Sequence, residues 1–214
     1  MGRPREFDID TAVKTATELF WRKGYEGTSL SDLTGAMRIT APSFYFAFGN
    51  KEKLFRVVIE QYYEKQLELL ESALQESTVR GVAAKFLYGY ADVLTGSSHA
   101  PGCLALNSSL PSAEDDTVRA WLAKLRGELI VRLRKRIAKA RGTTDLPVNA
   151  DPDVLARYIA VTAWGLAVEA QSGAKRKDLY SAIAVGLAAW PSAAATRPEQ
   201  RPTSRKSASS RIRQ

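Results

Sequence analysis

The chain has 214 residues, enough for one large domain or two small ones, and 45% of them are hydrophobic, an ordinary fraction for a globular protein. The formal net charge of +8 favours a polyanionic partner such as nucleic acid, whereas the single cysteine excludes an intramolecular disulfide. No secretory signal pattern and no uncharged run of roughly 20 residues is found, so we expect a cytoplasmic protein with no membrane partner.

Apolar residues recur at spacings of three and four along the chain, and no strand-like alternation is found. This pattern predicts an all-α fold of about nine helices. The first helix is expected from about residue 10 to residue 23, ending at Gly24. Two very short helices follow, one after Ser29 and one after Thr40, because both residue types are favoured at helix N-termini.

The two short helices are the most informative feature of the sequence. A helix of two turns is unstable alone in water, so a third element must brace such a pair. This layout is typical of a helix-turn-helix domain, in which the second short helix enters the major groove of DNA. We assign residues 1–50 to it. They carry six basic and six acidic residues, so DNA binding there must depend on the geometry of a few residues.

The remaining helices predict a larger domain over residues 51–190. A long helix is expected after Asn50, and a short one is expected to open at Pro101-Gly102. An amphipathic helix follows with a basic face over residues 126–141. Such a helix could lie on a membrane surface, but a solvated outer face of a helical bundle is the commoner cause, and we favour it.

The last two predicted helices, from about 152 to 171 and 175 to 190, carry more apolar positions than one packed face needs. A symmetric homodimer interface is the economical explanation. We expect it to contain Leu155, Ile159, Thr162, Ala163, Leu166, Ile183, Gly186 and Leu187. Residues 191–214 hold five of the eight net positive charges and little to bury, so we expect disorder. This tail either solubilises the protein, which we favour, or contacts DNA phosphates.

A set of residues at fixed spacing between positions 2 and 55 closely resembles the N-terminal domain of TetR-type transcriptional regulators. The matching positions are Gly2-Arg3-Pro4-Arg5, Leu19-Phe20, Gly24-Tyr25, Gly27-Thr28-Ser29, Asp32-Leu33, Ala36, Ile39, Ser43-Phe44-Tyr45, Phe48, Lys51-Glu52 and Leu54-Phe55. The resemblance implies a repressor that binds a palindromic operator in double-stranded DNA as a dimer, formed mainly through its last two helices. It also implies that a small-molecule effector relieves the repression. Beyond residue 60 only helix number and length agree.

The predicted recognition helix would present the following residues to base edges: Thr40, Ala41, Pro42, Ser43 and Phe46. None of them is an Arg, Asn or Gln, so we expect contacts with thymine methyl groups and reading of DNA shape. The resemblance places Thr28, Tyr45 and Lys51 on the DNA backbone, and it makes Arg3 and Arg5 an N-terminal arm. Tyr45 could instead be a core residue and Lys51 an idle surface lysine.

Arg38 departs from the family pattern, which usually has glycine in that turn. It could strain the backbone or add a phosphate contact, and both interpretations stay open.

The larger domain has enough aromatic residues with polar tips to surround an effector pocket for a lipophilic or aromatic molecule. The candidate lining residues are Tyr62, Tyr63, Phe86, Tyr90, Cys103, Leu106, Trp121, Leu125 and Trp164. For most of them an ordinary core role is the competing interpretation.

Cys103 is either a small buried residue, which we favour, or a thiol sensor of electrophiles and oxidants, as in some relatives with a Gly-Cys-Leu segment. His99 is expected on an exposed loop, and one His with one Cys makes no metal site. A small helical enzyme would need a third catalytic partner beside these two, and no metal or cofactor motif is found, so we expect neither enzyme nor cofactor. A carrier of apolar ligands would bind ligand but ignore DNA.

Overall fold

The computed structural model describes residues 8–97, 99–109 and 117–191, and this part of the chain folds into nine helices without a β-strand. The helices are α1 (Ile9–Lys23), α2 (Leu30–Met37), α3 (Ala41–Phe48), α4 (Lys51–Leu74), α5 (Val79–Leu94), α6 (Leu104–Asn107), α7 (Thr117–Ala140), α8 (Pro152–Gln171) and α9 (Arg176–Ala188). The predicted all-α fold is confirmed. Arg3, Arg5 and the tail from residue 192 onward lie outside the described residues.

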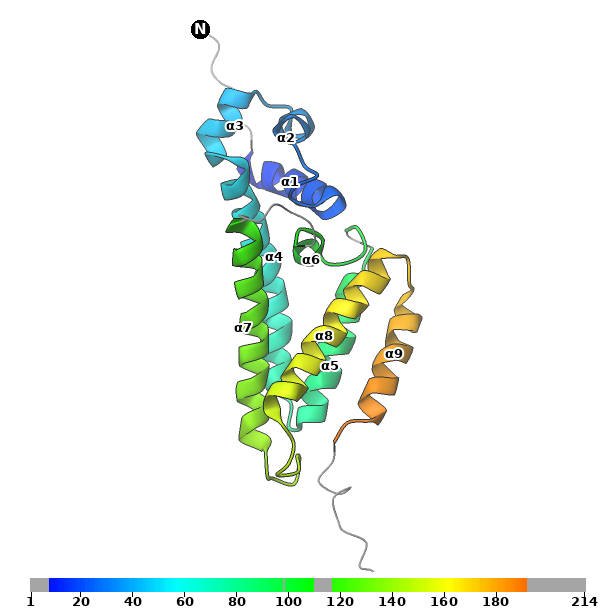
Figure 1. Cartoon of the computed structure of the whole chain (residues 1–214). Helices are drawn as coiled ribbons and strands as arrows, with labels where there is room; N and C mark the ends of the chain where they lie inside the picture. Colours follow the sequence, from blue (N-terminus) through cyan, green and yellow to red (C-terminus); the bar gives the residue numbers. More distant parts are fainter. Residues whose placement is uncertain (1–7, 98, 110–116, 192–214) are drawn as a thin grey trace, which may run out of the picture.

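Helices α1, α2 and α3 form a head at one end of the long helix α4 (Figure 1). Their starts are fixed by local chemistry, because side chains accept hydrogen bonds from the otherwise unpaired first amides. Ser29 and Asp32 form a reciprocal capping box on α2, Thr40 caps α3 and Asn50 caps α4. These predicted caps are confirmed.

The core of the head explains how helices of eight residues persist. Each of the helices α1 to α4 contributes one of four completely buried side chains: Phe20, Leu33, Phe44 and Phe55. The rings of Phe20 and Phe55 meet edge to face with centroids 5.0 Å apart, a favourable geometry for aromatic pairs. Tertiary burial therefore supplies the stability that α2 and α3 lack as isolated helices.

Helices α4, α5, α7, α8 and α9 form the larger bundle (Figure 1). Helix α8 packs on α5 and α7, and α9 packs on α5 and α8. The apolar stripe of α7 is buried in this bundle, as Leu122, Leu133 and Ile137 show. On its basic face, Arg132 pairs with Glu71, and Arg136 donates to main-chain carbonyls at the end of α4. This packing supports the bundle interpretation of α7, and none of the described helices could cross a membrane.

The single-turn helix α6 lies between the head and the bundle (Figure 1). The Asn107 side-chain amide donates a hydrogen bond of 2.8 Å to the carbonyl oxygen of Trp21 in α1. Gly24, which ends α1 with a φ of 71°, faces the same segment: a Cβ atom there would lie 3.2 Å from the Asn107 carbonyl oxygen. Glycine therefore suits this position both for its backbone angle and for the close approach.

Candidate DNA-binding surface and effector pocket

Helix α3 presents an apolar, aromatic surface to solvent. The side chain of Phe46 is 95% exposed and that of Tyr45 is 52% exposed, whereas Phe44 between them is completely buried. Thr40, Ala41 and Pro42 at the start of the helix are exposed as well. Ser43 is half-buried, and its hydroxyl oxygen lies 2.9 Å from that of Thr40. The residues predicted to face DNA bases therefore lie together on the free side of α3, with Ser43 at its margin.

Arg38 ends α2 in the left-handed region, with φ 57° and ψ 41°. It is the only non-glycine residue with positive φ in the described part of the chain. This conformation costs an L-residue roughly 1–2 kcal/mol relative to the right-handed region. The interpretation of Arg38 as a strained turn residue is thus supported. Its side chain is exposed, so a phosphate contact remains a prediction.

Thr28 is completely buried, and its hydroxyl donates a hydrogen bond of 2.7 Å to the Gly24 carbonyl. Its side chain therefore stabilises the turn between α1 and α2 and does not reach the surface. The hydroxyl turns inward because it bonds to the end of α1, and a contact of Thr28 with the DNA backbone stays a prediction.

Lys51 has a definite partner set inside the head. Its ammonium group donates hydrogen bonds of 3.1 Å to the carbonyl oxygens of Tyr25 and Thr28 and lies 4.2 Å from the centroid of the Tyr25 ring. It is therefore no idle surface lysine, because it ties the start of α4 to the α1–α2 turn. An ammonium group has three donors, so one is left for a phosphate, and that contact stays a prediction.

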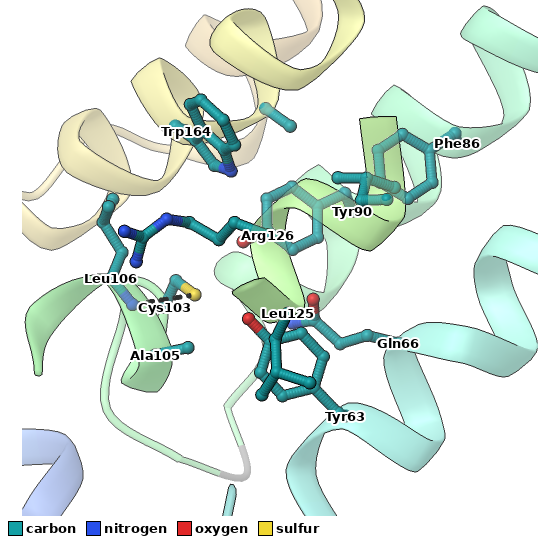
Figure 2. Close-up of a pocket in the computed structure, with 12 residues that line it drawn as sticks. Tyr63, Gln66, Phe86, Tyr90, Cys103, Ala105, Leu106, Leu125, Arg126 and Trp164 are labelled. Carbon is teal, nitrogen blue, oxygen red and sulfur yellow. Dashed lines mark hydrogen bonds between the residues drawn. The ribbon is translucent and has the colours of Figure 1, made fainter. Parts of the chain in front are cut away.

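A cavity of about 40 Å³ lies in the larger domain, within the bundle and beside α6 (Figure 2). Seven predicted residues line it: Tyr63, Phe86, Tyr90, Cys103, Leu106, Leu125 and Trp164. The sequence analysis missed Gln66, Ala105, Arg126, Leu129 and Ala163. Arg126 was expected on a solvated basic face, although its spacing of four from Leu122 and three from Leu129 places it beside the apolar stripe of the helix.

Two predicted pocket residues lie elsewhere. Tyr62 is buried between α1 and the cysteine: its ring meets Trp21 edge to face at 5.2 Å, and its hydroxyl donates a 3.1 Å hydrogen bond to the Cys103 sulfur. Trp121 packs under the guanidinium group of Arg56, 4.7 Å from the ring centroid. Both residues are therefore corrected from pocket lining to packing. Tyr62 turns away from Tyr63 because adjacent positions on a helix point to different sides, whereas Trp121 packs against Arg56 of α4.

Cys103 is the N-cap residue of α6, and its side chain is only 7% exposed. Its sulfur accepts hydrogen bonds from the Tyr62 hydroxyl and from the Leu106 amide at 3.4 Å. Burial, followed by the nearness of Cys103, raises the pKa of Tyr62, Tyr63 and Tyr90 well above the usual range. These three hydroxyls therefore remain neutral donors around the sulfur.

His99 does not lie on an exposed loop as predicted. Its ring is half-buried and stacks on the indole of Trp21, with centroids 4.1 Å apart and planes 17° from parallel. The stacking surface offered by Trp21 explains the difference.

The predicted dimer-interface residues mostly serve the chain's own core. Five of them are buried within the single chain, namely Ile159, Ala163, Leu166, Ile183 and Leu187. Gly186 packs under Tyr158, because a Cβ atom there would lie 2.0 Å from the Tyr158 hydroxyl oxygen. Leu155 and Thr162 are half-buried. The exposed apolar positions of these helices are instead Val154, Tyr158, Val161, Val168 and Val185, of which Val185 is 74% exposed.

Comparison with known proteins identifies the family. Residues 12–58 match the model for bacterial regulatory proteins of the tetR family. The HTH-type transcriptional repressor ComR of Escherichia coli (strain K12) is 31% identical over 193 residues, which cover 89% of this chain and 92% of ComR. The HTH-type transcriptional repressor BdcR of the same strain is 26% identical over 188 residues, covering 86% of this chain and 89% of BdcR.

Among solved structures, the chain resembles the TetR family transcriptional regulator CifR, a cysteine mutant complexed with 26-bp double-strand operator DNA. The two share 36% identity and a TM-score of 0.81, over 88% of this chain and all of the CifR chain. The match extends beyond the head into the larger domain. The chain therefore belongs to the TetR family of DNA-binding transcriptional regulators.

Proposed function

We propose that the protein is a dimeric repressor that binds a two-fold symmetric operator through α3 and releases it when an effector occupies the pocket. The observation that carries the proposal is the exposure of Phe46 and Tyr45 on a helix rigidly held by its caps and by Phe44. The Phe46 side chain is 95% exposed and contributes little to the stability of the fold, so we assign it a role in contacting a partner. Operator DNA in the complex of the related CifR supports DNA as that partner.

The chemistry of α3 supports a particular way of reading DNA. Its exposed residues lack the guanidinium and amide groups that make paired hydrogen bonds to guanine or adenine. Apolar contact with thymine methyl groups suits Phe46, and the Thr40 hydroxyl can bond to a base or phosphate. The rest of the specificity would come from the deformability of the operator.

Dimerisation is supported by the exposed valines of α8 and α9 and by Tyr158. Four of these positions, Val154, Tyr158, Val161 and Val168, are spaced by four, three and seven along α8, so they lie on one face of the helix. A dimer joined through this face fits two successive major grooves if its recognition helices lie about 34–36 Å apart.

The position of α6 supports a route for release. Cys103, Ala105 and Leu106 line the cavity, and Asn107, next in the chain, is bonded to Trp21 of the head. The cavity of about 40 Å³ is far smaller than the roughly 300–1,000 Å³ of typical ligand sites. A drug-sized effector would therefore have to displace its walls, and movement of α6 would pull on α1.

A thiol sensor acting through Cys103 is the second candidate. A specific observation favours it: the sulfur borders a cavity too small for a large ligand but roomy enough for the few atoms that oxidation or alkylation adds. Modification would break the hydrogen bond from the hydroxyl of Tyr62, whose ring packs on Trp21 of the head. Mass spectrometry after electrophile treatment, paired with operator binding of wild type and Cys103→Ser, separates the two routes of release.

Selection of bound DNA from a random pool tests the main proposal. The expected result is an enriched, two-fold symmetric site whose half-sites contain thymine steps. Absence of any enriched sequence at low salt would contradict it.

A further inference from the structure

One basic side chain of α7 differs from its neighbours. Arg132 pairs with Glu71, Arg134 lies 3.6 Å from Asp153, and Arg136 binds carbonyl oxygens at the end of α4. For Arg126, by contrast, no carboxylate of the described residues lies at ion-pair distance. It donates a hydrogen bond to the hydroxyl oxygen of Ser109, a neutral acceptor.

Arg126 lines the cavity beneath α8. In the view of Figure 2 its side chain reaches across the pocket, and the guanidinium group lies toward Trp164, Leu106 and Cys103. Arg126 is the one charged residue among those that line the cavity. A half-buried guanidinium group beside apolar walls loses hydration that the Ser109 hydroxyl replaces only in part. Among the residues that the structure describes, no anionic acceptor meets this group.

The other walls define what an anionic ligand must look like. Phe86, Tyr90 and Ala163 are buried at the inner side, whereas Tyr63, Arg126 and Trp164 are half-buried. An incoming molecule would thus meet the charge near the solvent side and apolar surface farther in. Tyr63 and Tyr90 turn their hydroxyls toward the same space, where they act as neutral donors (Figure 2). None of the described lining residues is a carboxylate, and the positive charge of Arg126 disfavours a cation.

The size of the cavity sets a further condition. At about 40 Å³ it holds about three water molecules, so a larger ligand must move a wall. Arg126 is a wall that can move, because it is half-buried and its stem has several rotatable bonds.

We infer that the effector is an organic carboxylate with an apolar body. Its carboxylate pairs with Arg126, and its apolar part lies against Phe86 and Tyr90. This inference rests on the proposed function, since it names the ligand class of the same pocket. A planar carboxylate suits the guanidinium group, which can donate two parallel hydrogen bonds to it.

Calorimetric titration of the purified full chain tests the inference with matched probes. The probes are phenylacetate, 4-phenylbutyrate and octanoate, each paired with its primary amide of nearly equal shape. At least one carboxylate should bind about tenfold or more tightly than its amide, as a charge-assisted hydrogen bond in place of a neutral one predicts. Arg126→Met should abolish the preference and Arg126→Lys should retain part of it.

Arg134→Met is the matched control, because Arg134 lies on the same helix and faces Asp153 instead of the cavity. It should keep the full preference. The inference is overturned if no carboxylate of the panel binds, if acids and amides bind equally, or if Arg126→Met keeps the preference. Should Arg126→Met not fold, Arg126→Gln replaces it. Operator binding without probe is measured separately: a protein that prefers carboxylates but ignores DNA upholds this inference and refutes the proposed function.

Discussion

The side-chain amide of Asn107 donates a hydrogen bond of 2.8 Å to the main-chain carbonyl oxygen of Trp21, joining α6 at the pocket to α1 of the head. The same side chain accepts a 3.1 Å hydrogen bond from Gln171 at the end of α8. One residue thus connects the head, the pocket wall and the bundle. In the proposed mechanism, this connection transmits the state of the pocket to the recognition helix.

Asn107→Asp should uncouple pocket and head, since the carboxylate still accepts from Gln171 but cannot donate to Trp21. We expect a loss of stability of about 1 kcal/mol, typical for one hydrogen bond. Effector binding should persist while operator release weakens several-fold, measured by anisotropy of labelled operator. Gln171→Ala is the control that removes only the bond to α8. Full release by Asn107→Asp would exclude this bond from the coupling.

Phe46→Ala should reduce operator affinity without unfolding the head. Because the side chain is 95% exposed, the free energy of unfolding should change by no more than about 0.5 kcal/mol. Phe44→Ala on the same helix is the contrasting variant: Phe44 is completely buried, and its truncation should cost about 3–5 kcal/mol. Replacing operator thymines by uracil, which lacks the methyl group, should weaken wild type but affect Phe46→Ala less. Equal weakening of both proteins would show that Phe46 does not contact the thymine methyl groups.

Lys51→Ala should have two separable effects. Loss of the hydrogen bonds to Tyr25 and Thr28 should destabilise the head by about 1–3 kcal/mol, seen in thermal or urea unfolding. Loss of a phosphate contact should weaken binding to all sequences and lower the salt slope by about one unit. A variant that is less stable but has an unchanged salt slope would leave Lys51 with only its structural role.

Substitutions of Arg38 can separate strain from charge. Arg38→Gly should stabilise the protein by up to about 1 kcal/mol, because glycine tolerates the left-handed conformation. Arg38→Ala keeps the strain and removes only the guanidinium group. If Arg38 contacts phosphate, both variants should bind DNA more weakly and with a smaller salt slope than wild type. Unchanged affinity in both would assign the residue to the turn alone.

The sequence predicted best those features that depend on local chemistry. The starts of α2, α3 and α4 followed from the capping residues Ser29, Thr40 and Asn50, since a cap and its helix lie next to each other in the chain. The residues on the exposed face of α3 followed from the helix-turn-helix layout, in which the start of the second short helix faces DNA. The glycine usual at this turn in the family indicates a positive φ, and Arg38 adopts that conformation.

Features that depend on which side of a helix meets its neighbour were predicted less well. Tyr62 and Tyr63 are adjacent, yet only Tyr63 lines the cavity. Helix α8 is apolar on several sides, so its pattern could not tell Ile159, which packs inward, from Val161, which faces out. Arg126 was assigned to the basic face of α7, although its spacing from Leu122 and Leu129 also fits the apolar stripe, and the structure places it at the pocket. In these cases the contacts between helices determine which way a side chain faces, and the sequence period does not specify those contacts.

The central claim is that two chains act together, each placing one α3 in a neighbouring major groove. Analytical ultracentrifugation of the protein on its selected operator, compared with an isolated half-site, tests this most directly. The account predicts a dimer in free solution, two chains or a whole multiple of two on the full site, and much weaker binding to the half-site. A monomer that binds a half-site as tightly as the full operator would contradict it.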